Sequence, residues 1–150
     1  MEITTEIIRE LREKTGVSVM QCKKALEEAA GDLAKAEVVL KKNSVISALK
    51  KAERTLKAGT IGIYAHDTNI GAMVLLSSES DFVAKNPEFR ELARALAMQV
   101  AAMNPEKTED LLEQPFIKDE SKTVHDLLNE ATQKFGERIE VSQFARVSVH

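Results

Sequence analysis

The chain has 150 residues and a net charge of −3 at pH 7, with 43% hydrophobic and 30% charged residues. This composition is typical of a globular protein with a buried core and excludes a wholly disordered chain. No stretch approaches the roughly 20 apolar residues of a membrane-spanning helix, and the N-terminus lacks the features of a secretory signal. Cys22 is the single cysteine, so no internal disulfide can form. We therefore expect a cytoplasmic protein in a reducing compartment.

The charge divides unevenly along the chain. Residues 1–60 carry a net charge of +3, whereas residues 61–150 carry −6. This difference predicts domains of different character within an α+β protein. We expect a three-helix partner-docking module over 1–43, a basic linker helix over 44–58 and an α+β core domain over 59–150.

The N-terminal segment predicts three short helices. Thr4 is a suitable N-cap for the first helix, and Gly16 supplies its stop. Ser18 fits a capping box at the start of the second helix, which Gly31 ends, and Asp32 can cap the third. The apolar residues recur at spacings of three and four and should form the core of a small bundle: Ile7, Ile8, Leu11, Cys22, Leu26, Ala29, Leu33, Ala36, Val39 and Leu40.

The segment from Lys41 to Lys57 is strongly basic, with a partial apolar stripe, and predicts the linker helix. Clustered cations can bind nucleic acid by releasing counterions from phosphates. This segment contains no aromatic residue, however, and the whole protein is slightly acidic. A solvated helix face is therefore the favoured interpretation, and we expect neither nucleic acid nor a membrane as a partner.

After Gly59 the apolar residues alternate, which is typical of strands. Residues 61–65 and 70–76 predict an antiparallel hairpin with a turn between them. Asn86 and Pro87 then begin a long amphipathic helix. Its apolar face should comprise Phe89, Leu92, Ala93, Leu96, Val100 and Met103.

The last third of the chain predicts a loop, a helix and a strand. Residues 105–120 are polar and should form a loop with at most one short helical turn. Ser121 should cap the next helix, and Gly136 should close it. Five apolar residues fall on one face of a final strand: Ile139, Val141, Ala145, Val147 and Val149. The order β-β-α-α-β can form a three-stranded antiparallel sheet covered by helices on one face.

No catalytic constellation is evident. His66, His125 and His150 lie far apart in the sequence, without partners at metal-ligand spacing. Cys22 sits among small apolar residues, which favours a packed thiol over a nucleophile. No glycine-rich phosphate loop occurs either. We expect a protein that is not an enzyme and that needs no metal or cofactor.

A polar break separates the second strand from the long helix. It places Phe82 between two rigid elements, where we expect a loop. Loops of this kind often display functional side chains. The alternative from the residues alone is that Phe82 caps the core of the hairpin, because aromatic residues near strand ends usually pack inward.

Three ordered motifs carry a family resemblance. Residues 15–26, Thr-Gly-Val-Ser-Val-Met-Gln-Cys-Lys-Lys-Ala-Leu, resemble the N-terminal module of elongation factor Ts. Residues 80–86, Ser-Asp-Phe-Val-Ala-Lys-Asn, resemble its Thr-Asp-Phe-Val-Ala signature. Residues 134–139, Lys-Phe-Gly-Glu-Arg-Ile, resemble its Lys-Ile-Gly-Glu-Asn-Ile segment. The resemblance covers nearly the whole chain.

The resemblance implies a guanine nucleotide exchange factor for elongation factor Tu, a GTPase of translation. It implies that a ubiquitin-associated-like module docks on the GTPase domain and that an aromatic wedge beside the nucleotide and magnesium site promotes GDP release, without covalent chemistry. The implied exchange loop consists of Ser80, Asp81, Phe82 and Val83, with Val83 as an inward anchor. The implied docking residues are Val17, Val19 and Met20, of which Val19 and Met20 could equally belong to the core of the module.

The chain also departs from the family. Many members carry a second core subdomain and an inserted coiled coil, and neither fits into 150 residues. A homodimer through the core sheet, across its exposed edge, could supply the second unit. Two other functions stay open: an adaptor that binds helices or peptides through the bundle, and a small hydrolase that uses His66 and Asp81.

Overall fold

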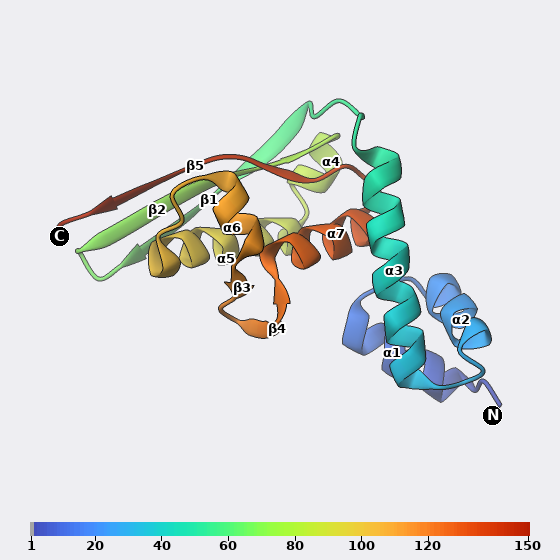
Figure 1. Cartoon of the computed structure of the whole chain (residues 1–150). Coiled ribbons are helices and arrows are strands. Elements are labelled where there is room, and N and C mark those ends of the chain that lie inside the picture. Colours follow the sequence, from blue (N-terminus) through green and yellow to red (C-terminus); the bar gives the residue numbers. More distant parts are fainter. Residues whose placement is uncertain (1) are drawn as a thin grey trace. The chain divides into compact units, whose positions relative to one another are not determined.

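The computed structural model describes residues 2–150, which divide into two compact units (Figure 1). The first unit ends at Ala52 and also includes Asn129–Gly136. The second unit comprises Glu53–Leu128 and Glu137–His150. The C-terminal segments 129–136 and 137–150 therefore belong to different units.

Three helices build most of the first unit: α1 (Thr5–Thr15), α2 (Val19–Glu28) and α3 (Leu33–Lys51). The predicted N-caps are confirmed, because the side chains of Thr4, Ser18 and Asp32 each accept a hydrogen bond from the backbone N–H three residues later. Gly16 ends α1 with a left-handed φ of 73°. The buried core of the bundle comprises Leu11, Val17, Cys22, Ala25, Leu26, Ala29, Ala36 and Leu40.

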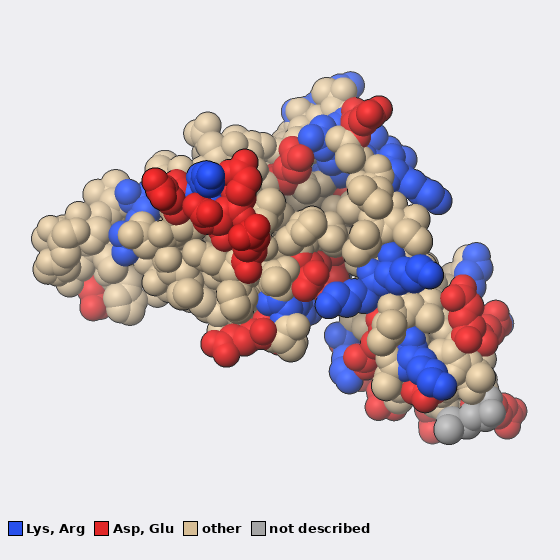
Figure 2. Space-filling model, in the orientation of Figure 1, with Lys and Arg blue, Asp and Glu red and all other residues tan. Residues whose placement is uncertain are grey.

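The segment expected to form a separate linker helix is instead the second half of α3, which runs unbroken to Lys51. No glycine or proline interrupts residues 33–51, so nothing in the sequence forces a break. Ser44 lies inside this helix with its hydroxyl donating to the Lys41 carbonyl oxygen at 2.6 Å. Figure 2 shows Lys and Arg side chains gathered over the C-terminal end of α3, as the basic sequence predicts.

The second unit is built on a three-stranded antiparallel sheet of β1 (Ala58–His66), β2 (Ile70–Ser78) and β5 (Glu140–Ser148), in the order β1-β2-β5. Helix α5 (Pro87–Met103) packs on one face of this sheet (Figure 1). Its predicted start is confirmed, since the Asn86 side chain caps the helix and Pro87 occupies its first turn. The α+β class and the three-stranded sheet are thus confirmed.

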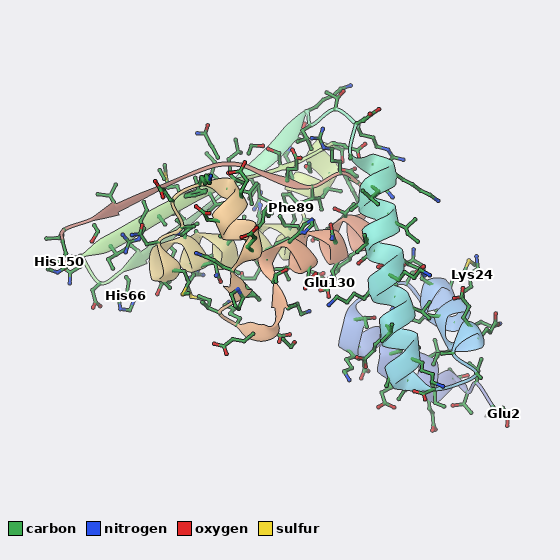
Figure 3. All side chains as sticks on the ribbon, in the orientation of Figure 1. Glu2, Lys24, His66, Phe89, Glu130 and His150 are labelled. Atoms are coloured by element: carbon green, nitrogen blue, oxygen red, sulfur yellow. The ribbon has the colours of Figure 1, made fainter. Side chains whose placement is uncertain are left out.

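The inner face of α5 supplies much of the core of this unit. Figure 3 shows Phe89, which is fully buried, on the side of α5 that faces the interior. Ala93, Leu96 and Val100 are also buried, as their spacing predicts. Met103 is exposed, so the expectation that it continues this face is wrong. The helix ends at Met103, two residues beyond the buried Ala101, with Asn104 in the left-handed conformation.

The segment expected to be a loop contains three further elements: α6 (Thr108–Glu113), β3 (Pro115–Phe116) and β4 (Asp119–Thr123). Gln99 of α5 fixes the hairpin of β3 and β4. Its buried amide donates to Gln114 and to the Pro115 carbonyl oxygen and accepts from the Ile117 N–H. These bonds are tertiary, so local sequence patterns do not reveal them.

Helix α7 (Val124–Phe135) begins later than predicted. Ser121 lies within β4, and the expectation that it caps this helix is wrong. Thr123 takes that role, because its hydroxyl accepts from the Asp126 N–H while the Asp126 carboxylate accepts from the Thr123 N–H. Gly136 follows the helix with a φ of 72°, which confirms the predicted stop.

Strand β5 changes face in its middle. Leu75 pairs with Gln143 while Leu76 pairs with Val141, so Ser142 is an extra residue in a β-bulge. Because side chains alternate along a strand, the bulge reverses which residues face α5. Val141 is 7% exposed, whereas Val147 is 74% exposed. The expectation that all five apolar residues share one face is therefore wrong beyond Ser142.

Candidate functional site

Phe82 is 85% exposed, more than any other large hydrophobic side chain among residues 2–150. The alternative that it caps the core of the hairpin is therefore wrong. The polar break is not a loop, as expected, but a single helical turn, α4 (Asp81–Ala84). Phe82 and Asp81 project into solvent from this turn, and with Lys85, Asn86 and Pro87 they line a shallow surface hollow.

The turn forms because both of its ends are fixed. At its start, the Ser80 hydroxyl accepts a hydrogen bond from the Val83 N–H, which is the arrangement of an N-cap. At its end, the Thr60 hydroxyl of β1 donates to the Ala84 carbonyl oxygen at 2.8 Å. The side chains of Val83 and Ala84 are buried, so Val83 is inward-facing. A rigid turn with two buried residues thus presents one exposed ring.

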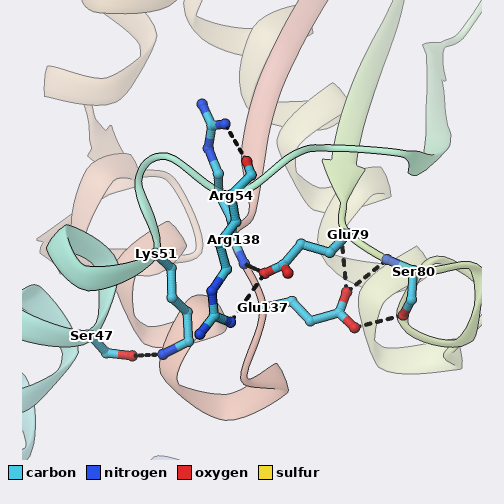
Figure 4. A network of polar contacts seen from close by, with 7 residues as sticks. All are labelled: Ser47, Lys51, Arg54, Glu79, Ser80, Glu137 and Arg138. Atoms are coloured by element: carbon cyan, nitrogen blue, oxygen red, sulfur yellow. Dashed lines mark hydrogen bonds and ion pairs between the residues drawn. The ribbon is translucent and has the colours of Figure 1, made fainter.

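A network of polar contacts joins this turn to the segment after α7 (Figure 4). The Glu137 carboxylate accepts hydrogen bonds from the backbone N–H groups of Glu79 and Ser80, at 3.1 and 3.0 Å, and from the Ser80 hydroxyl at 2.6 Å. The Glu79 carboxylate in turn accepts from the Arg138 N–H. The second and third sequence motifs therefore meet in space.

Two arginines complete the network. The Arg138 guanidinium donates to the Arg54 carbonyl oxygen at 2.6 Å and lies 2.9 Å from the Glu140 carboxylate. The Arg54 guanidinium lies 3.5 Å from the Glu79 carboxylate. The pair Ser47 and Lys51, also drawn in Figure 4, forms a separate hydrogen bond within α3. The sequence motifs point to Ser80 as a site residue, whereas the roles of Glu79, Glu137 and the two arginines arise only from contacts that the fold creates.

The three docking residues implied for the N-terminal module are placed differently. Met20 is 68% exposed and Val19 is half exposed, on the first turn of α2. Val17 is buried in the core of the bundle. It precedes the N-cap Ser18, and Cys22 occupies the fourth helical position, so the two form the pair of a hydrophobic staple. The staple pattern can be recognised in the sequence. With Val17 in the core, Val19 and Met20 are the two accessible residues of the three.

The hydrolase alternative is contradicted by the register of the hairpin. Ala58 pairs with Ser78, so Asp81 follows the end of the sheet opposite to His66. Eight residues of strand separate the two ends, about 26 Å. His66 instead approaches the Tyr64 hydroxyl at 3.1 Å. Figure 3 shows His66 near His150 at its end of the sheet.

Cys22 is a packed thiol rather than a candidate nucleophile. Its side chain is fully buried and contacts the Val17 carbonyl oxygen at 3.5 Å. Burial raises the pKa of this thiol, which keeps it protonated. Residues 2–150 contain no group of three or more His, Cys, Asp or Glu side chains that could hold a metal ion. No helix in the same range is long and apolar enough to cross a membrane.

Comparisons with known proteins agree with the three motifs. A family model described as "Elongation factor TS" matches residues 2–110 and 79–150. An elongation factor Ts of Thermodesulfovibrio yellowstonii is 39% identical over an alignment that covers 99% of this chain and 97% of that protein. That of Oleidesulfovibrio alaskensis is 40% identical and covers 96% of each. A chloroplastic polyprotein of EF-Ts from Oryza sativa subsp. indica is 37% identical over 98% of this chain and 17% of its own length.

The relatives are longer than this chain. The alignment with the protein of Thermodesulfovibrio yellowstonii spans 193 positions, whereas this chain has 150 residues. At least 43 positions (193 minus 150) therefore have no counterpart here. Because nearly all of both chains is aligned, the missing positions lie within the alignment.

Proposed function

The chain belongs to the elongation factor Ts family of translation elongation factors, and we propose that it promotes the release of GDP from elongation factor Tu. The observation that carries this proposal is the position of Phe82. Its ring is almost fully exposed on a turn whose neighbouring residues are buried and capped. A monomeric protein gains no stability from such a ring, so contact with a partner is its natural use.

The proposed mechanism uses binding energy and no covalent chemistry. The Phe82 ring enters an apolar pocket that is available when the GTPase has opened its nucleotide and magnesium site. Burial of a phenylalanine side chain contributes about 1.5–3 kcal/mol, which offsets the distortion of the partner. The ring shifts the equilibrium only because it binds the open state better than the closed one. Linkage makes the effect reciprocal: this protein lowers the affinity of the GTPase for GDP by some factor, and GDP lowers the affinity of the GTPase for this protein by the same factor.

The remaining residues have supporting roles in this proposal. Ser80 and Val83 hold the turn, while Asp81 is exposed beside the ring and can meet amide groups of the partner. Val19 and Met20 form an apolar docking patch on the module proposed for residues 1–43. Val17 supports that patch from the core. The family assignment also supports the expected cytoplasmic location, where translation takes place.

The decisive test is the release of fluorescent GDP from purified elongation factor Tu. We expect the wild-type protein to accelerate release and Phe82→Ala to lose about ten- to a hundredfold of that acceleration, which corresponds to 1.5–3 kcal/mol. Val149→Ala is the matched control, because it truncates another exposed apolar side chain of the same unit. An absence of acceleration by the wild type, with binding retained, would instead favour the adaptor function.

The second part of the proposal concerns a homodimer through the core sheet. The face of the sheet opposite α5 is apolar and uncovered. Across the three strands the register aligns Ile61, Leu75 and Gln143, then Ile63, Met73 and Ala145, then Ala65, Gly71 and Val147. None of these residues is charged, and a two-fold axis would bring identical apolar surfaces together without a charge conflict. We therefore propose this outer face, rather than the sheet edge, as the contact between two copies.

A further inference from the structure

Two glutamates join the Phe82 turn to the segment after α7 in a reciprocal way. Glu137 binds the backbone N–H groups of Glu79 and Ser80, and Glu79 binds the N–H of Arg138. Each carboxylate thus satisfies backbone donors of the other segment. Hydrogen bonds to a charged acceptor are stronger than neutral ones, so this clamp fixes two segments that lie 58 residues apart in the sequence.

The hydroxyl of Ser80 stands at the centre of this clamp. A serine hydroxyl has one proton to donate, and here the proton goes to Glu137 at 2.6 Å. The oxygen is then oriented to accept from the Val83 N–H, the bond that caps α4. Glu137 therefore determines the direction in which the Ser80 cap points.

The Phe82 ring depends on this cap because it has little support of its own. The ring is 85% exposed, so few protein atoms restrain it, and its direction is set by the backbone of a four-residue helix. A helix of this length is not stable alone. Its position comes from the cap at its start, from Thr60 at its end and from the buried side chains of Val83 and Ala84.

We propose that Glu137 is a positioning residue for exchange: its carboxylate holds the Ser80 cap and thereby fixes the Phe82 ring in the direction that the partner receives. This inference rests on the proposed function. Without the carboxylate the turn samples other conformations, and ordering it again on binding reduces the rate at which productive complexes form. Glu137 acts through Ser80 and the two backbone N–H groups that it binds.

Glu137→Gln is the sharpest variant. The side-chain amide keeps the size of the residue and one oxygen for the two backbone N–H groups. It replaces the oxygen that receives the Ser80 proton with an N–H donor, so the charge-assisted bond that Ser80 donates at 2.6 Å cannot form. Glu120→Gln is the matched control, because Glu120 is an exposed carboxylate on β4. Ser80→Thr should behave as the wild type, because it retains the hydroxyl.

The first measurement needs no partner. The chain contains no tryptophan, so Phe82→Trp introduces a single reporter at the position of interest. We expect time-resolved anisotropy to show a larger amplitude of local motion when Glu137→Gln is added and no change when Glu120→Gln is added. Equal anisotropy decays with and without Glu137→Gln would overturn the proposal, whatever the protein does to elongation factor Tu.

The second measurement is a double-mutant cycle on GDP release, in the wild-type and Phe82→Ala backgrounds. We expect Glu137→Gln to reduce the acceleration about tenfold in the wild-type background and to have almost no effect once the ring is absent. An equal loss in both backgrounds would mean that Glu137 only stabilises the fold, and the positioning role would be rejected.

The two measurements separate this inference from the proposed function. If Phe82→Ala leaves GDP release unchanged, the proposed function fails, while the anisotropy still decides whether Glu137 holds the turn. Circular dichroism melts accompany each variant. Should Glu137→Gln fail to fold, Ser80→Ala removes the same hydrogen bond from its other end, together with the cap of α4, and the same increase in the amplitude of local motion is expected.

Discussion

Gly62 marks the closest approach of α5 to the sheet. A β-carbon added there would lie 2.1 Å from the carbonyl oxygen of Ala93, an atom of the helix backbone that cannot rotate away. We expect Gly62→Ala to destabilise the protein by at least about 1–3 kcal/mol, because helix and sheet must separate. Gly71→Ala is the control, since a β-carbon added there would lie 4.0 Å from the Tyr64 carbonyl oxygen, an ordinary contact distance. Urea unfolding measures both, and equal midpoints would show that α5 yields without cost.

Single residues also show where sequence reasoning succeeds and where it stops. The exposure of Phe82 follows from the motif that contains it. The residue type alone favours the opposite, because an aromatic side chain near a strand end usually packs inward. The roles of Glu79 and Glu137 could not be predicted, since their partners are backbone groups almost 60 residues away. The burial of Val17 could have been predicted from the staple pattern around Ser18. Short-range signals were thus sufficient for caps and insufficient for the clamp.

Among the elements, the three-helix bundle depends on very few large core residues. Leu26 is fully buried in the last turn of α2, in a unit too small to absorb a cavity easily. We expect Leu26→Ala to cost about 2–5 kcal/mol. The matched control is Val38→Ala on α3, an exposed position where the change should stay within about 0.5 kcal/mol. Denaturant melts followed by circular dichroism compare the two, and a similar cost for both would contradict the assignment of Leu26 to the core.

The elements that were predicted correctly are those with local start and stop signals. Caps at Thr4, Ser18, Asp32 and Asn86 locate four helices, and the hairpin of β1 and β2 follows from alternation. The hairpin of β3 and β4 was missed because the side chain of Gln99 holds it through tertiary contacts. The bulge at Ser142 was missed because it appears only when β5 pairs with β2.

At the scale of the whole molecule, the three-stranded sheet has one face covered by a helix and one face exposed. Helix α5 buries one face, while Ile61, Ile63, Met73 and Val147 leave the other apolar and exposed. The relative from Thermodesulfovibrio yellowstonii has at least 43 further residues, so this protein has fewer residues with which to cover the exposed face of the sheet. A small protein buries a smaller fraction of its surface than a large one, which makes association the simplest way to cover such a patch.

The dimer proposal predicts a specific mass in solution. We expect light scattering at micromolar concentration to give twice the 16.6 kDa of one chain. Ile63 lies in the middle row of the outer face and is 61% exposed, so Ile63→Lys should leave the fold intact. It should give the mass of a monomer, because two lysines would face each other across the two-fold axis without counter-charges. Thr68→Lys, in the exposed turn between β1 and β2, adds the same charge outside the face and should remain dimeric. A monomeric wild type would refute the dimer, and a dimeric Ile63→Lys variant would move the contact to the sheet edge.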